Sequence, residues 1–169
     1  MFRWLLDKVA ASTPEGARGF AGAVRSTMVG TDDETIRIVV AVAGLLGTVA
    51  YADRRYEAEE ERHIRRELER IHALTAAGVD AVCTALRQHI VEISTIEAPL
   101  YARELLTLTD RDFRVQVLDA LVDLAASDNE ITVAETNVLR LTATALGLTQ
   151  NDYNASQAMH RDKLTVFKK

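Results

Sequence analysis

Cysteine and proline are scarce in this chain of 169 residues, which contains one cysteine and two prolines. A single thiol, Cys83, cannot form a disulfide within the chain and cannot supply a cysteine-based zinc site. Because disulfides mark oxidising compartments, this composition favours the reducing cytoplasm. With so few prolines, long helices can form without interruption.

The sequence also predicts no targeting segment and no membrane-spanning segment. The first apolar run, 4–6, is much shorter than the roughly 7 to 15 residues in the hydrophobic part of a signal peptide. The longest apolar stretch, 38–52, stops at Asp53 and falls short of the about 20 residues that cross a bilayer. We therefore expect a buried core helix, in a protein of the cytoplasm or of the inner face of the membrane.

A basic face is missing as well. The net charge is −5, and nucleic acids are normally bound by a basic surface, so we expect no nucleic acid partner. Residues 1–30 carry four basic and two acidic side chains, which leaves a charge of −7 on the remainder. We expect this acidic remainder to engage a partner protein.

The apolar residues recur with a period of 3.6 along nearly the whole chain, a pattern that predicts helices. Residues 2–9 match the spacing of an amphipathic helix, and a second helix, weakened by glycines, follows near 20–28. We assign residues 1–30 to a helical appendage and 31–169 to the main domain. The helix over 2–9 either folds back on that domain, enters a partner's groove or makes a peripheral membrane contact.

About seven helices are predicted in the main domain, and capping residues mark where several of them begin. Asp32, Thr75 and Asp110 can each act as an N-cap, and Pro99 can open a helix. Between the first two helices lies an acidic loop, and the second helix, over 58–74, is rich in charge. The chain is therefore predicted to be all-α.

The second half of the chain repeats the first. Residues 50–60 align without gaps on residues 125–135, and each segment is followed by a polar helix and then by a helix with a threonine cap. A unit of this size cannot bury its apolar face alone, so two halves should share a core around a pseudo-twofold axis. Three pairs of identical residues support the alignment: Ala50 with Ala125, Asp53 with Asp128, and Glu60 with Glu135.

This repeated motif resembles the TerB-like family, which includes the tellurite-resistance TerB proteins and a region of the co-chaperone DjlA. The family pattern is a helix ending in Ala-x-Ala-Asp-Gly-x-Ile, then a capped helix with a glutamate one turn in. The resemblance covers about 32–160, with the motif at 50–56 and at 125–131. The family glycine is replaced by Arg54 and by Asn129, and asparagine adopts a left-handed backbone more readily than arginine.

The resemblance implies an all-helical fold with acidic loops proposed to hold divalent cations, often in proteins acting near membranes or in stress response. Calcium and magnesium prefer oxygen ligands, which both loops contain. The second loop offers Asp128, Asn129, Glu130 and Glu135. The first loop offers a degenerate counterpart in Asp53, Glu57 and Glu60. The positive charges of Arg54 and Arg55 should weaken binding at the first loop.

A purely structural interpretation of the second loop is the stronger alternative. The spacing Thr132-x-x-Glu135 is that of a capping box, in which the two side chains bond each other's backbone amides. Acidic side chains at a helix start also complement the helix dipole, which disfavours a cation there. The carboxylates therefore serve either the helix start alone or a weak cation site as well.

A helical metalloenzyme is the alternative class. The spacing Glu-x-x-His occurs at 60–63 and at 69–72, and di-iron carboxylate bundles use this spacing to place two ligands on one helix face. Here both copies fall on one predicted polar helix, whereas such bundles draw ligands from several helices. His89 and His160 have no neighbouring nucleophile in the sequence, and Cys83 lies on an apolar face. We therefore favour a non-enzymatic binding module.

Overall fold

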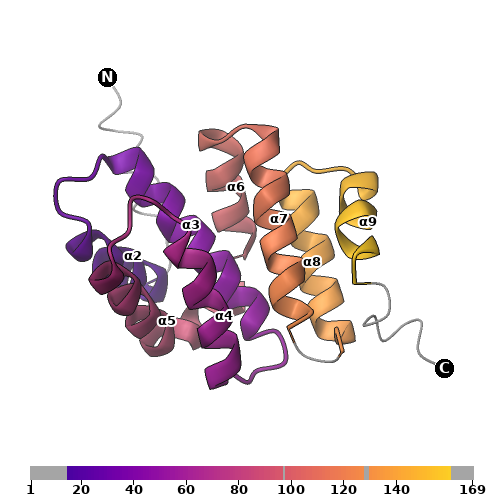
Figure 1. The fold of residues 1–169 in the computed structure, drawn as a ribbon, viewed down its shortest axis with the longest axis horizontal. Helices are drawn as coiled ribbons and strands as arrows, with labels where there is room; N and C mark the ends of the chain where they lie inside the picture. Colours follow the sequence, from indigo (N-terminus) through magenta and orange to yellow (C-terminus); the bar gives the residue numbers. More distant parts are fainter. Residues whose placement is uncertain (1–14, 97, 128–129, 161–169) are drawn as a thin grey trace.

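The computed structural model describes residues 15–96, 98–127 and 130–160, and the regular elements in these segments are α-helices (Figure 1). The predicted all-α fold is confirmed, and seven helices, α3 to α9, lie within the predicted main domain. The helix expected over 2–9 lies outside the described residues. The elements are α2 (Glu15–Thr27), α3 (Asp33–Ala50), α4 (Ala58–Glu69), α5 (Ala76–Ile96), α6 (Ala98–Leu108), α7 (Arg111–Ala125), α8 (Val133–Ala145) and α9 (Gln150–Ala158).

Side-chain caps begin the helices where the sequence predicts them. Asp32 accepts a hydrogen bond from the backbone N of Thr35 (2.8 Å), and Asp110 accepts one from the backbone N of Phe113 (2.8 Å). Each bond satisfies an amide that the first helical turn leaves without a partner. The charged helix α4 ends at Glu69 rather than at the predicted residue 74, because the chain turns there before the start of α5.

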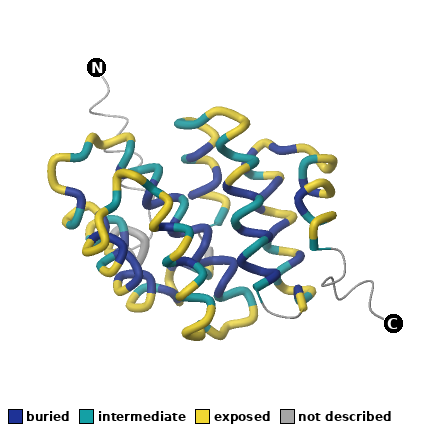
Figure 2. Tube along the Cα trace, viewed as in Figure 1, coloured by how far each residue is buried: buried dark blue, intermediate teal, exposed yellow. Residues whose placement is uncertain are grey.

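Helix α3 is the centre of the molecule. Figure 1 shows α2 and α5 on one side of it and α6 to α9 on the other, and α3 contacts α2, α4, α5, α6, α7 and α8. Every residue of α3 from Ala43 to Ala50 is buried, which confirms the prediction of a core helix. Figure 2 shows buried residues along α3 and α7 and exposed residues at the outer turns.

A glycine allows the close approach of α3 to α6. A Cβ atom at Gly44 would lie 2.6 Å from the ring of Tyr101, so a larger residue would force the two helices apart. No helix in the described segments is both long and apolar enough to cross a membrane.

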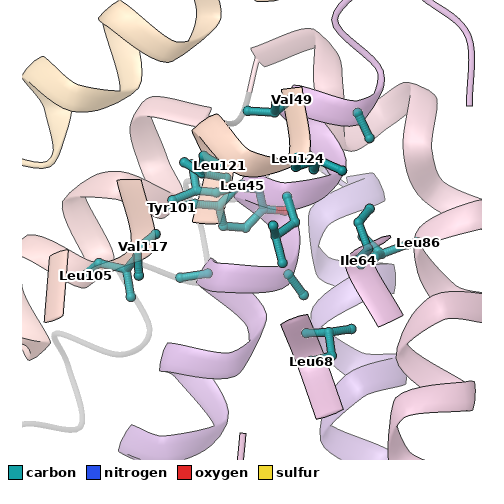
Figure 3. Close-up of a cluster of buried hydrophobic side chains, with 14 of the residues drawn as sticks. Leu45, Val49, Ile64, Leu68, Leu86, Tyr101, Leu105, Val117, Leu121 and Leu124 are labelled. Carbon is teal, nitrogen blue, oxygen red and sulfur yellow. The ribbon is translucent and has the colours of Figure 1, made fainter. Parts of the chain in front are cut away.

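The two halves pack their equivalent residues into one core. The alignment that pairs Ala50 with Ala125 also pairs Leu46 with Leu121, and both leucines are almost fully buried. Figure 3 shows side chains of α3, α4 and α7 in one cluster, among them Leu45, Ile64 and Leu121. Each half contributes three helices that contact one another, α3 to α5 in the first and α7 to α9 in the second.

Helix α2 joins the same core. The cluster shared with the main domain includes Phe20 and Val24 of α2 and also Met28, which follows the helix, and α2 packs chiefly on α5. A Cβ atom at Gly19 would lie 2.9 Å from the ring of His89, so the glycine lets α2 approach α5 closely. Part of the predicted appendage thus contributes to the core, while the domain boundary at residue 30 stays a prediction.

Candidate functional site

The first acidic loop connects α3 to α4, and its carboxylates bond the backbone. An oxygen of Asp53 accepts a hydrogen bond from the backbone N of Arg55 (2.9 Å). Glu57 is the N-cap of α4 and forms a capping box with Glu60, whose carboxylate accepts a hydrogen bond from the Glu57 amide. Both glutamates expected as cation ligands therefore hold the start of a helix.

Arg54 occupies the position of the family glycine and adopts a left-handed backbone, with φ of +66°. This conformation costs a residue with a side chain about 1 to 2 kcal/mol, because Cβ crowds the following carbonyl oxygen. The loop geometry that glycine favours is thus kept, although the glycine itself is not. The arginine also brings a positive charge beside Asp53.

The second acidic loop connects α7 to α8 and ends in the predicted capping box. The carboxylate of Glu135 accepts hydrogen bonds from the backbone N (2.7 Å) and the hydroxyl (2.8 Å) of Thr132, and the Thr132 hydroxyl accepts one from the Glu135 amide (3.2 Å). The side chain of Ile131 is fully buried beneath the loop, whereas Glu130 is exposed. Asp128 and Asn129 lie outside the described residues.

The structure therefore describes all the predicted cation ligands except Asp128 and Asn129. Among the described residues, no three histidine, cysteine, aspartate or glutamate side chains are grouped so that they can hold a metal ion. Asp53, Glu57 and Glu60 thus do not form such a group. Because two ligands of the second set are not described, the cation site at that loop stays a prediction.

The two Glu-x-x-His motifs do not lie on one helix, contrary to expectation. Glu60 belongs to the capping box, and α4 ends at Glu69, so His72 lies beyond the helix. His63 faces Glu67 instead, with 3.9 Å between Nε2 and Oε1. Burial lowers the pKa of His63, and the Glu67 carboxylate opposes this change only in part.

Cys83 is buried in the core, and His160 contacts a neighbouring helix. Cys83 is fully buried, as predicted, and burial raises the pKa of its thiol, which disfavours the reactive thiolate. His160 follows α9 and places Nε2 2.6 Å from an oxygen of Asp123 on α7. This contact ties the end of α9 to α7 and lies at the edge of a feature that sequence reasoning missed.

That feature is a groove of about 610 Å³ formed by α3, α4, α7 and the turn after α4, here called the α3/α4/α7 groove. Five of its nine apolar residues, Ile38, Val42, Ile71, Phe113 and Ala120, are half-buried and remain accessible to a ligand. The apolar lining consists of Ile38, Val39, Val42, Leu46, Ile71, Phe113, Val117, Ala120 and Leu121.

The polar lining of the groove is acidic. Carboxylates come from Glu67, Asp119 and Asp123, and the one guanidinium, that of Arg70, is paired with Glu67 (3.3 Å). The side chain of Asp123 is 47% exposed despite its contact with His160. The repeat aligns Val42 with Val117, and both residues line the groove. The groove therefore follows the seam where the first helices of the two halves meet.

The fold defines a class: an all-helical domain in which two three-helix units share a core, each with a capped acidic loop after its first helix. The model of the family described as "Tellurite resistance protein TerB" matches residues 39–158, and the chain belongs to this family. The TerB-like resemblance of the repeated motif is thereby confirmed. Comparisons with curated proteins and with solved structures give no match.

Proposed function

We propose that this chain is a non-enzymatic TerB-type binding module whose α3/α4/α7 groove receives a short, apolar and positively charged segment of a partner protein. The observation that carries the proposal is the groove itself, with its apolar floor and acidic rim. The TerB family is in general non-enzymatic, which supports a binding role. A tellurite-resistance or envelope-stress context, and a kinship with DjlA, belong to the same proposal.

The dimensions and surface of the groove suit a peptide. Its volume lies within the about 300 to 1,000 Å³ typical of ligand sites, which is room for a few side chains. Apolar side chains placed over Ile38, Val42 and Phe113 would be stabilised by about 25 cal/mol for each Å² removed from water. The carboxylates at the rim would select a positively charged segment over a negatively charged one.

Photo-crosslinking in living cells tests this function. A photoreactive phenylalanine analogue at Gln116, which lines the groove, is compared with the same analogue at Leu141, an exposed residue of α8. We expect Gln116 to yield a defined adduct with another protein, and Ile38→Lys to abolish that adduct. Equal adducts from both positions, or none from Gln116, would reject the groove as the binding surface.

The second acidic loop favours a second candidate function, weak binding of calcium or magnesium. Residues 125–135 contain no lysine or arginine, unlike the first loop with Arg54 and Arg55. Asp128, Asn129, Glu130 and Glu135 are the proposed ligands, with Asp53, Glu57 and Glu60 as the weaker counterpart.

Thermal melting with and without the ion tests this second function, because a ligand of the folded state raises its melting temperature. Asp128→Asn should remove the calcium-induced rise while leaving the capping box of Glu135 in place. Asp53→Asn, in the weaker first loop, should retain most of the rise. If calcium and magnesium leave the melting temperature of the wild type unchanged, the loop is a structural cap only.

A further inference from the structure

We propose that residues 161–169, the segment that follows α9, occupy the α3/α4/α7 groove in the free protein. A partner then has to displace a segment of the chain itself. This inference rests on the proposed function of the groove and names its resident occupant.

The position of His160 carries the first step. Its Nε2 lies 2.6 Å from an oxygen of Asp123, and Asp123 is one of the residues that line the groove. The chain therefore begins the segment 161–169 at the rim of the groove. No long connection has to be closed for the segment to enter, so the entropy lost on docking is small.

The length of the segment is sufficient. Nine residues reach at most about 30 Å when extended, at roughly 3.3 to 3.6 Å each. The groove follows α7 from Asp123 back to Phe113, which at 1.5 Å per helical residue is about 15 Å. The segment can therefore run the full length of the groove in an extended or a partly coiled form.

The chemistry of the segment complements the groove. It contains four basic side chains and one acidic one, for a charge of +3, together with Leu164, Val166 and Phe167. The groove presents an apolar floor and the carboxylates of Glu67, Asp119 and Asp123. Apolar contact and charge attraction thus favour the same placement, and tethering raises the local concentration of the segment to the millimolar range.

Residues 2–9 are the rival occupant within the chain, since they also combine apolar and basic side chains. Their connection to the described structure is α2, which packs chiefly on α5 and also on α3. The C-terminal segment, in contrast, leaves the structure at a residue in contact with the groove. The observations therefore favour residues 161–169.

Amide NMR spectra of the full-length protein provide the first test. Leu164→Ser with Phe167→Ser keeps the charge and removes the apolar contacts, and Thr165→Ser is the matched control. We expect the double variant to shift the amides of Ile71, Val117 and Ala120, and the control to leave them unchanged. Unshifted groove amides in the double variant would overturn the inference. So would equal shifts caused by Phe2→Ser with Leu6→Ser, which would identify the N-terminal segment as the occupant.

Disulfide trapping provides a second, independent test. Cysteines at Gln116 and Thr165 should form an intramolecular disulfide at least about tenfold faster than cysteines at Leu141 and Thr165, because docking raises the effective concentration. Native Cys83 is fully buried and stays in both variants. Equal rates for the two pairs would overturn the inference. Dimers linked through the cysteine introduced at position 116 would overturn it too, since a second copy would then fill the groove.

The two proposals can fail separately. If the segment does not dock but Gln116 still crosslinks to another protein, the groove is a partner site without a resident occupant. If the segment docks and no partner crosslinks to Gln116, even with Leu164→Ser and Phe167→Ser, the intramolecular contact stands and the proposed function falls.

Discussion

The two acidic loops occupy equivalent places in the two halves, yet different side chains hold them. The first loop begins α4 with a pair of glutamates, Glu57 and Glu60, and takes its left-handed turn at Arg54. The second begins α8 with Thr132 and Glu135, a combination that is much preferred at helix starts. Equivalent positions of the repeat, Glu57 and Thr132, therefore cap the two helices with different chemistry.

The cores of the two halves differ less than their loops. Ile64 on α4 and Leu139 on α8 are equivalent in the repeat and are both fully buried. A buried position tolerates only apolar residues of about the right volume, whereas several polar residues can cap a helix. The core thus keeps apolar residues at equivalent positions, and the loops are where the chemistry of the two halves differs.

The largest predicted effect comes from shortening this matched pair of core residues. Ile64→Ala and Leu139→Ala should each lower the free energy of unfolding by about 2 to 5 kcal/mol, because each leaves a cavity in the shared core. Urea denaturation followed by circular dichroism measures both. A loss confined to one variant would show that the halves do not share one cooperative core.

Changes to the two N-caps should have smaller effects on the free energy of unfolding, and the effects should have opposite signs. Thr132→Ala removes the cap of α8 and should lower the free energy of unfolding by about 1 kcal/mol. Glu57→Thr copies the second cap into the first loop and should raise that free energy by a few tenths of a kcal/mol. Thermal melts of both variants and of the wild type measure these changes. A loss of stability in Glu57→Thr would contradict the prediction that threonine caps this helix better than glutamate.

Restoring the family glycine should relieve the first loop. Arg54→Gly should raise the free energy of unfolding by up to about 1 kcal/mol, because relief of the left-handed strain exceeds the entropy that glycine adds to the unfolded chain. The neighbouring control Arg55→Gly adds the same entropy without that relief and should lower it. Chemical denaturation of the pair tests the prediction, which fails if both variants change stability in the same direction.

The smallest predicted effect is on how strongly the free energy of unfolding depends on pH. Burial lowers the pKa of His63 in the folded state, so near pH 6.5 the unfolded chain binds the proton more readily. The free energy of unfolding should therefore fall as pH drops from 7.5 to 5.5. His63→Val copies Val138, the equivalent residue of the second half, and should reduce that fall. An unchanged pH slope in His63→Val would show that other groups cause it.

The sequence predicted well the features that depend on periodicity and local capping. Helix starts at Asp32, Asp110 and Thr132 follow from side chains within one turn of the amides that they bond. The repeat predicted which helices correspond, because the packing of each half demands the same apolar positions. These are local or periodic properties, and one chain is enough to show them.

The groove escaped prediction because it depends on how the halves pack. Val42 and Val117 both look like ordinary core positions in the sequence, and only the packing of α3 against α7 leaves space between them and α4. The contact between Asp123 and His160 likewise joins residues on different helices, which no local pattern reveals. The end of α4 at Glu69 was also missed, since the apolar period continues through Ile71 into the following turn.

The most direct test of the account is a binding titration on the groove. The partner segment identified by crosslinking at Gln116 is synthesised and titrated by calorimetry into wild type, Ile38→Lys and Leu141→Lys, with melts to confirm that each variant is folded. We predict that Ile38→Lys weakens binding at least about tenfold, or about 1.4 kcal/mol, while Leu141→Lys binds as the wild type does. Equal affinity of wild type and Ile38→Lys would contradict the assignment of the α3/α4/α7 groove as the binding surface.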